Sequence, residues 1–129
     1  MEMSVQQTLI IVKPDGVAKG LVGQILRTVE SNGLTIVDST RLHLDRSWVE
    51  NLYGSERDQP YFMEVVEWVS SAPVLFLKVQ GEQAVDKVKW QIIGRYPDGI
   101  RGRYSENWIK NVAHAPDSVQ SAEQELEQA

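Results

Sequence analysis

Two histidines and a small set of lysines and arginines are the residues of this chain best suited to catalysis. The sequence holds no cysteine, which excludes disulfides, thiolate metal sites and a cysteine nucleophile. His43 lies in a strand-like pattern, and we expect an ordinary surface histidine. His114 follows Val112-Ala113 and precedes the turn Ala115-Pro116-Asp117, so we expect its imidazole at a strand end. A neutral imidazole there can act as nucleophile, base or ligand, and a structural role stays open beside these.

Several basic residues also stand where the chain should turn. Lys13 ends an apolar stretch and precedes Pro14-Asp15-Gly16, a turn that should direct its side chain toward solvent. Arg95, Arg101 and Arg103 share one glycine-containing loop, which suits multidentate contact with phosphate oxygens, although composition alone favours a solvated basic loop. Neither histidine has a second one at ligand spacing, so no metal site is expected. Because the glycine-rich Lys-Ser/Thr phosphate loop is missing, any phosphate must be held by side chains.

The bulk composition is that of an average globular chain. Its 129 residues are 42% hydrophobic and 24% charged, which predicts one domain over residues 1–129. The net charge of -5 argues against general nucleic-acid binding. The apolar runs are only a few residues long, whereas a bilayer span needs about 20, and no leader-like segment opens the sequence. We therefore expect a cytoplasmic protein.

The apolar pattern predicts alternating strands and helices. Strands are expected at Thr8–Val12, Leu34–Leu44, Pro73–Val79 and Lys110–His114. Helices are expected over residues 21–29 and 48–53, from Pro60 to Val69, and from Ala84 to Ile92. Gly94–Gly102 should be a loop, Asp117–Gln120 resembles a capping box, and Glu123–Gln128 should be a solvated helix end. This order predicts an α+β sandwich with helices against one face of a four-stranded sheet.

Two longer segments resemble the signature segments of nucleoside diphosphate kinases. They are Thr8–Val17 and Asn111–Ser118. Shorter stretches fit the family in order, namely Gly20–Gly23, Tyr61-Phe62, Ile100–Gly102 and Ser118–Glu123. The resemblance covers nearly the whole chain, from about Thr8 to Glu125. Within that family, the sequence resembles a variant that has a shortened loop at residues 94–101 and a short C-terminus.

The resemblance implies a ferredoxin-like βαββαβ fold with a four-stranded antiparallel sheet, and a ping-pong phosphotransferase. A nucleoside triphosphate gives its γ-phosphate to a histidine, and a nucleoside diphosphate collects it. It further implies ATP and other nucleoside di- and triphosphates as substrates, Mg²⁺ carried by their phosphates, and a homo-oligomer. The alternative is a catalytically weak or inactive nucleotide-binding or scaffold member of the same fold.

The resemblance also implies roles for single residues. His114 would be the phosphorylated nucleophile, Lys13 would contact the phosphates, and Tyr53 would place its hydroxyl near the phosphoryl group. Asn111 would bind the sugar, and Glu125 would orient the imidazole. The other contacts implied are Tyr61 and Trp108 with the base and Arg101 with phosphate.

Several positions depart from the family pattern. Trp90 stands where an arginine is expected. The missing charge would come from Lys89, if the helix shifts register, or from Arg95. Tyr96 stands where a phosphate-binding threonine is common, and Pro116 takes the place of a serine that supports the histidine. Each such change removes a charge-assisted or polar contact, worth about 1.5–3 kcal/mol where the group bonded is charged.

Overall fold

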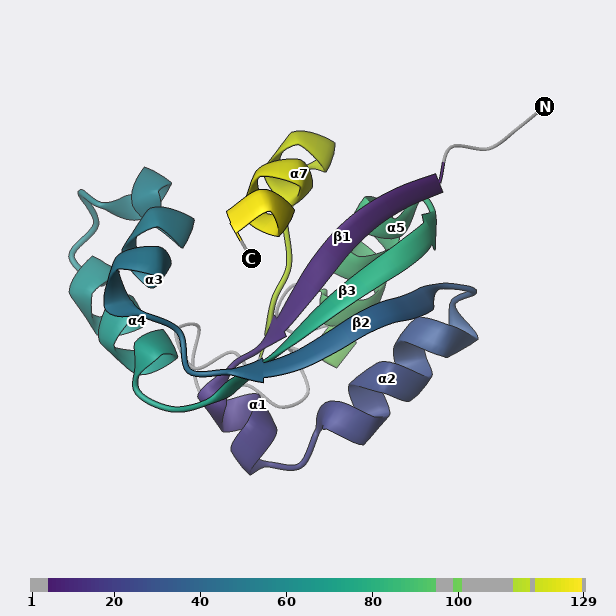
Figure 1. Cartoon of the computed structure of the whole chain (residues 1–129), viewed down its shortest axis with the longest axis horizontal. Coiled ribbons are helices and arrows are strands. Elements are labelled where there is room, and N and C mark those ends of the chain that lie inside the picture. Colours follow the sequence, from purple (N-terminus) through teal and green to yellow (C-terminus); the bar gives the residue numbers. More distant parts are fainter. Residues whose placement is uncertain (1–4, 95–98, 101–112, 117, 129) are drawn as a thin grey trace.

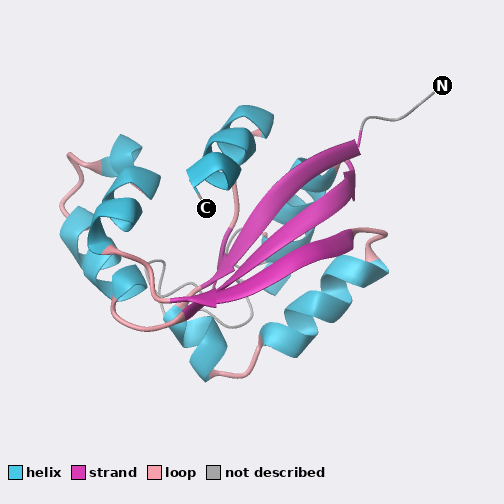
Figure 2. Ribbon diagram, in the orientation of Figure 1, coloured by secondary structure: helices cyan, strands magenta, loops and turns pink. Residues whose placement is uncertain are grey.

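Four strands of the described chain form one antiparallel sheet. The computed structural model describes residues 5–94, 99–100, 113–116 and 118–128. The strands are β1 (Val5–Val12), β2 (Thr35–Leu42), β3 (Val74–Glu82) and β4 (Ala113–His114). Their order in the sheet is β2-β3-β1-β4, with every neighbouring pair antiparallel. The long strands β2, β3 and β1 lie side by side in Figure 2. This confirms the ferredoxin-like antiparallel sheet that the resemblance implies, with further helices between β2 and β3.

The helices lie on both sides of this sheet. They are α1 (Pro14–Ala18), α2 (Val22–Ser31), α3 (Arg46–Leu52), the 3-10 turn η1 (Gly54–Glu56), α4 (Phe62–Ser70), α5 (Ala84–Asp86), the π-helix η2 (Lys87–Ile93) and α7 (Val119–Gln128). Figure 1 shows α3 and α4 side by side as a hairpin, with α7 on the same side of the sheet. Helices α2 and α5 cover the opposite side.

Strand β1 is buried on both faces, and this determines the layers. Every side chain from Leu9 to Val12 is 0% exposed, and successive strand residues point to opposite faces. Ile10 joins a first cluster with residues of α2, α5 and η2. Leu9 and Ile11 join a second cluster with residues of α3 and α4, against which Leu126 of α7 packs. The prediction placed helices against one face of the sheet, which accounts for the first cluster only. Helices cover the second face as well, because β1 is apolar at consecutive positions.

The helix expected from Ala84 to Ile92 forms, but most of it is a π-helix. Residues Lys87–Ile93 are π-helical, and the N–H of Gly94 donates to the carbonyl of Lys89, five residues earlier, over 2.9 Å. A π turn holds one more residue than an α turn. The side chains that follow are therefore shifted in register relative to an α-helix.

Two helix starts differ from the sequence prediction. Pro60 lies in a turn before α4 rather than in its first turn, since α4 begins at Phe62. At the start of α7, Ser118 acts as the cap, because its Oγ accepts the N–H of Ser121 over 3.0 Å. The acidic cap expected at Asp117 lies outside the described residues.

The core assignment predicts a large loss of stability on truncation of β1. We expect Ile10→Ala to lower the free energy of unfolding by about 2–5 kcal/mol, because it empties a fully buried site. Val5, at the exposed start of the same strand, is 63% exposed, so Val5→Ala should change stability by no more than about 0.5 kcal/mol. Urea denaturation of both variants measures the difference, and equal effects would contradict the assigned core.

Candidate active site

Strand register places the imidazole of His114 on the face covered by α3, α4 and α7. His114 ends β4 and lies opposite Ile11 of β1. Directly opposed strand residues share a face, and Ile11 belongs to the second cluster. Lys13 follows Ile11 by two residues with extended backbone angles, so its side chain starts from that same face. The antiparallel pairing thus brings Lys13 and His114 together from distant parts of the sequence.

A short hydrogen bond fixes the ring of His114. Its Nε2 lies 2.6 Å from Oε1 of Glu125 in α7, and the two side chains are only 14% and 15% exposed. An ionised carboxylate can only accept, so Nε2 carries the proton and Nδ1 of the neutral ring keeps its lone pair. The residue pattern alone predicted a solvated helix end at Glu123–Gln128. That prediction is wrong at Glu125, because α7 packs on the sheet and turns this carboxylate inward.

Tyr53 and Lys13 lie beside the imidazole. The rings of Tyr53 and His114 have centroids 5.7 Å apart at 68°, and Nζ of Lys13 is 5.7 Å from the Tyr53 centroid. Lys13 is 3% exposed, so the expectation that it points to solvent is wrong. Helix α1 begins at Pro14, directly after the strand, and holds Lys13 at the strand end. An ammonium over an aromatic face is favourable, and its burial strengthens its attraction for an anion.

A second lysine reaches the same strand end from the opposite layer. Nζ of Lys89 donates to the carbonyl of Ala115, the residue after His114, over 3.1 Å. The same ammonium lies 5.9 Å from the ring centroid of Trp90. Lys89 is half-buried, whereas Trp90 is 41% exposed. The side chain of Lys89 therefore reaches the backbone directly after His114, whereas Trp90 is exposed.

Tyr61 is held by a carboxylate that the sequence did not single out. It precedes α4, packs against the second cluster and donates its hydroxyl to Oε1 of Glu56 over 2.9 Å. Burial, then the hydrogen bond and the negative charge of Glu56, raise the pKa of the Tyr61 hydroxyl above its ordinary value. The hydroxyl therefore remains a donor. Neither helical nor strand spacing pairs residues five apart, so periodicity could not predict the contact between Glu56 and Tyr61. The one signal in the sequence is an acidic residue shortly before a tyrosine, with a proline turn between them.

The remaining sequence candidates fall into two groups. Arg95, Tyr96, Arg101, Trp108 and Asn111 lie outside the described residues, so their roles stay predictions. His43 is exposed, with Nε2 placed 2.6 Å from the carbonyl of Ser70, which confirms the expectation of a surface histidine.

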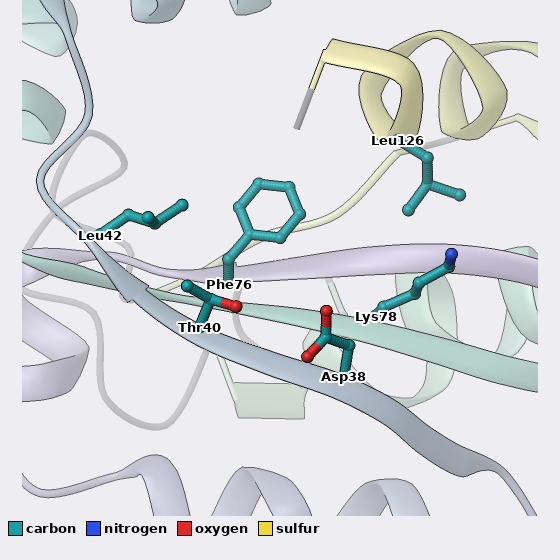
Figure 3. A pocket seen from close by; sticks show the side chains of 6 residues that line it. All are labelled: Asp38, Thr40, Leu42, Phe76, Lys78 and Leu126. Carbon is teal, nitrogen blue, oxygen red and sulfur yellow. The ribbon is translucent and has the colours of Figure 1, made fainter.

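A cavity of about 330 Å³ lies apart from these residues, between α7 and the outer part of the sheet (Figure 3). It is lined by Asp38, Thr40, Leu42, Phe76, Lys78 and Leu126. Asp38 and Lys78 are register partners on β2 and β3, so their charges oppose one another across the strands. The lining includes no sequence-predicted site residue and no excess of positive charge, which makes it a poor phosphate site.

The part of the chain that the structure describes contains neither a cluster of metal ligands nor a membrane-spanning helix. No group of three or more histidine, cysteine, aspartate or glutamate side chains there could hold a metal ion. None of the helices described is both long and apolar enough to cross a membrane.

The arrangement around His114 suits attack on a negatively charged electrophile. One ring nitrogen is fixed as a donor to Glu125, which leaves the other as a nucleophile. Lysine ammonium groups approach from two layers, Lys13 beside Tyr53 and Lys89 at the following carbonyl. Preorganised cations of this kind stabilise charge that develops during transfer of a phosphoryl group.

The family model described as "Nucleoside diphosphate kinase" matches residues 6–129. Among curated relatives, the nucleoside diphosphate kinase of Frankia casuarinae is 38% identical, with 97% of this chain and 95% of the relative aligned. That of Archaeoglobus fulgidus is 39% identical, with 94% of this chain and 83% of the relative aligned.

Solved structures show the same similarity in three dimensions. A crystal structure of the Aquifex aeolicus nucleoside diphosphate kinase superposes with a TM-score of 0.89 at 34% identity, covering 97% of this chain and 94% of the other. The apo enzyme of Encephalitozoon cuniculi gives 0.90 at 30% identity, covering 95% and 87%. The similarity therefore holds in sequence as well as in fold.

The geometry predicts a single tautomer for the neutral ring of His114. In ¹⁵N NMR spectra of labelled protein, Nε2 should be protonated and Nδ1 unprotonated, because Glu125 accepts only from Nε2. Glu125→Gln should keep this tautomer, since the amide oxygen can still accept. Glu125→Ala should give a mixture of tautomers. An unchanged single tautomer in Glu125→Ala would show that another group fixes the ring.

Proposed function

We propose that this chain, which belongs to the nucleoside diphosphate kinase family, carries its transient phosphate on His114. The chain is an enzyme that transfers the γ-phosphate of a nucleoside triphosphate to a nucleoside diphosphate. The observation that carries the proposal is the 2.6 Å hydrogen bond between His114 and Glu125. It makes Nε2 the protonated ring nitrogen, so that Nδ1 carries the lone pair that would attack phosphorus.

The reaction divides into two displacements at phosphorus. In the first, Nδ1 of His114 attacks the γ-phosphorus. The N–P bond forms as the bond to the β–γ bridging oxygen breaks, and the nucleoside diphosphate leaves with that electron pair. In the second, a terminal β-phosphate oxygen of the acceptor attacks the same phosphorus, and the N–P electrons return to Nδ1. The proton stays on Nε2 throughout, held by its hydrogen bond to Glu125. The carboxylate also offsets the positive charge that the ring carries while it is phosphorylated.

Lys13 is proposed to hold the transferred group. Its buried ammonium lies over the ring of Tyr53, which itself contacts the imidazole edge to face. A phosphoryl group between His114 and Lys13 would have its negative charge neutralised as it moves. Tyr53 is proposed to position the lysine by its ring and to approach the phosphoryl group with its hydroxyl.

Lys89 is proposed to supply the cation that the arginine expected at position 90 would have supplied. Its Nζ is bonded to the carbonyl beside His114, and an ammonium has three donors. The support is the π-helical register of η2, which turns Trp90 out to 41% exposure. Arg95 and Arg101, which lie outside the described residues, would add further phosphate contacts.

Mg²⁺ is proposed to arrive on the nucleotide phosphates. The described side chains around the site are the carboxylate of Glu125, already bonded to the ring of His114, the ring of Tyr53, and two lysine ammonium groups. This set fits phosphate oxygens rather than a resident metal. The ion would neutralise phosphate charge when bound, and Lys13 and Lys89 would orient the phosphates that carry it.

The rest of the substrate would follow the family pattern. Tyr61 is proposed as the platform on which the base stacks, since aromatic stacking suits every base. Trp108 would form the opposite wall, Asn111 would bind the sugar, and Tyr96 would contact phosphate. A single catalytic domain over residues 1–129 is consistent with the two core clusters sharing β1.

The protein is also proposed to form a homo-oligomer and to act in the cytoplasm. A homo-oligomer is supported by β2, which ends the described sheet and exposes apolar Val37 and Leu42 at 44% and 36%, because exposed strand edges invite pairing. A cytoplasmic location is supported by the nucleotide substrates and by the lack of cysteine.

Loss of the nucleophile should abolish both half-reactions. Incubation with ATP should add one phosphoryl group to the intact mass of the protein, and the modification should be acid-labile. His114→Ala should show no phosphoenzyme and no transfer from ATP to a nucleoside diphosphate in a coupled assay. His43→Ala is the matched control, because that ring is on the surface, and it should retain both. A His114→Ala protein that still becomes phosphorylated would overturn the proposal.

Loss of the second lysine should weaken catalysis without unfolding the protein. We expect Lys89→Met to lower kcat/KM by about 10- to 150-fold, the equivalent of about 1.5–3 kcal/mol for a charge-assisted hydrogen bond. Lys87→Met should have little effect, because residues two apart on a helix do not share a face. Adding Trp90→Arg to Lys89→Met tests the register. Full rescue would mean that position 90 faces the site, contrary to the structure.

A further inference from the structure

The short connection between α3 and α4 carries an acid that the reaction does not use. It begins with Tyr53, which contacts His114, and ends with Tyr61. Between them, η1 places Glu56 by a 2.9 Å hydrogen bond from its N–H to the carbonyl of Tyr53. The side chain of Glu56 then reaches forward to the hydroxyl of Tyr61 over 2.9 Å. One tight turn therefore fixes a carboxylate relative to both aromatic rings.

The sign of this charge assigns it to one end of the substrate. The phosphates of a nucleotide are anionic and are drawn to Lys13 and Lys89. A carboxylate beside them would oppose binding by charge repulsion. Glu56 instead bonds to Tyr61, the proposed base platform, so its charge lies at the nucleoside end. This step rests on the proposed function.

The geometry of the Glu56–Tyr61 bond brings the carboxylate within reach of a stacked base. The phenolic oxygen lies at the edge of the ring, and a base stacked on that ring extends over the edge. Oε1 of Glu56 lies 2.9 Å from this oxygen, within reach of an exocyclic substituent of a base stacked on the ring. An ionised carboxylate has about four acceptor sites and no donor. After accepting from Tyr61, it can accept again from an N–H of the base.

We propose that Glu56 is a specificity-determining residue that favours nucleotides whose base carries an exocyclic amino group. Guanine and cytosine bear such an N–H₂ donor. Hypoxanthine has only a hydrogen atom in place of the guanine 2-amino group, and uracil has a carbonyl oxygen in place of the cytosine 4-amino group. A carbonyl oxygen facing the carboxylate would be repelled and would lose its water without compensation. The enzyme therefore transfers phosphate to all nucleoside diphosphates through one site but ranks them by this contact.

The test compares acceptors that differ as little as possible. With ATP as the fixed donor, GDP and IDP differ only in the 2-amino group, and CDP and UDP form a second pair. We expect kcat/KM to be about three- to tenfold higher for GDP than for IDP, and for CDP than for UDP, the modest size reflecting a half-exposed carboxylate. In Glu56→Leu both ratios should fall to about one.

Two controls separate specificity from positioning. Tyr61→Phe removes the hydroxyl but keeps the ring and the carboxylate, so the ratios should stay above one even if KM rises for every acceptor. Asp58→Leu removes an exposed acid from the same turn and should leave the ratios unchanged. If Glu56→Leu raises KM equally for GDP and IDP, Glu56 only positions Tyr61, and the specificity proposal is wrong.

Calorimetry keeps this inference distinct from the proposed function. Equilibrium binding of GDP and IDP to the wild-type protein and to Glu56→Leu needs no phosphotransfer. A preference for GDP that disappears in Glu56→Leu supports the contact even if His114 is not phosphorylated. Equal binding of GDP and IDP by the wild-type protein overturns the contact even if the phosphoenzyme forms normally.

Discussion

The hydrogen bond between His114 and Glu125 is the interaction on which the rest of the site depends. It joins the last residue of the edge strand β4 to the C-terminal helix, and both partners are largely shielded from water. A polar bond is stronger in such surroundings than at the surface, and an unpaired member would be costly to bury. The bond exists only if α7 lies flat on the sheet, which Ala122, fully buried, and Leu126 ensure. Packing of a helix thereby decides which nitrogen of the imidazole carries the proton.

The two faces of the sheet contribute to the site in different ways. The face covered by α3, α4 and α7 supplies side chains that surround the imidazole, namely Tyr53 and Glu125, while Lys13 enters at the end of β1. The opposite face supplies Lys89, which reaches the backbone after β4 rather than the ring. The central strand must be apolar on both sides for this to work, and Leu9–Val12 are completely buried. The same strand that forms the core therefore leads into a buried cation over the ring of Tyr53, which contacts His114.

The sequence predicted the strands and helices well, because their apolar patterns are strong. It also predicted that His114 lies at a strand end, from its place between an apolar pair and a turn. It could not predict the burial of Lys13, since that depends on α1 starting at once after β1. It also placed the last helix cap at Asp117, whereas Ser118 bonds the Ser121 N–H; both residue types are good caps. Glu56 was missed because its partner Tyr61 is joined to it by a turn, and turns have no period from which contacts can be read.

The π-helix shows why position in an alignment and position in space can differ. Trp90 occupies the place where the family resemblance calls for a cation, which taken alone would mean a weakened site. A π turn accommodates one residue more than an α turn, so a side chain one place earlier can face the direction that the aligned residue would have faced. Such turns are less favourable than regular helix and are found mostly where function retains them. Here the wide turn ends at Gly94, whose φ of 70° an L-residue would adopt only with strain. In the proposed function, the loss of the cation at position 90 and the irregular helix form one change, in which the backbone brings Lys89 to the place of that cation.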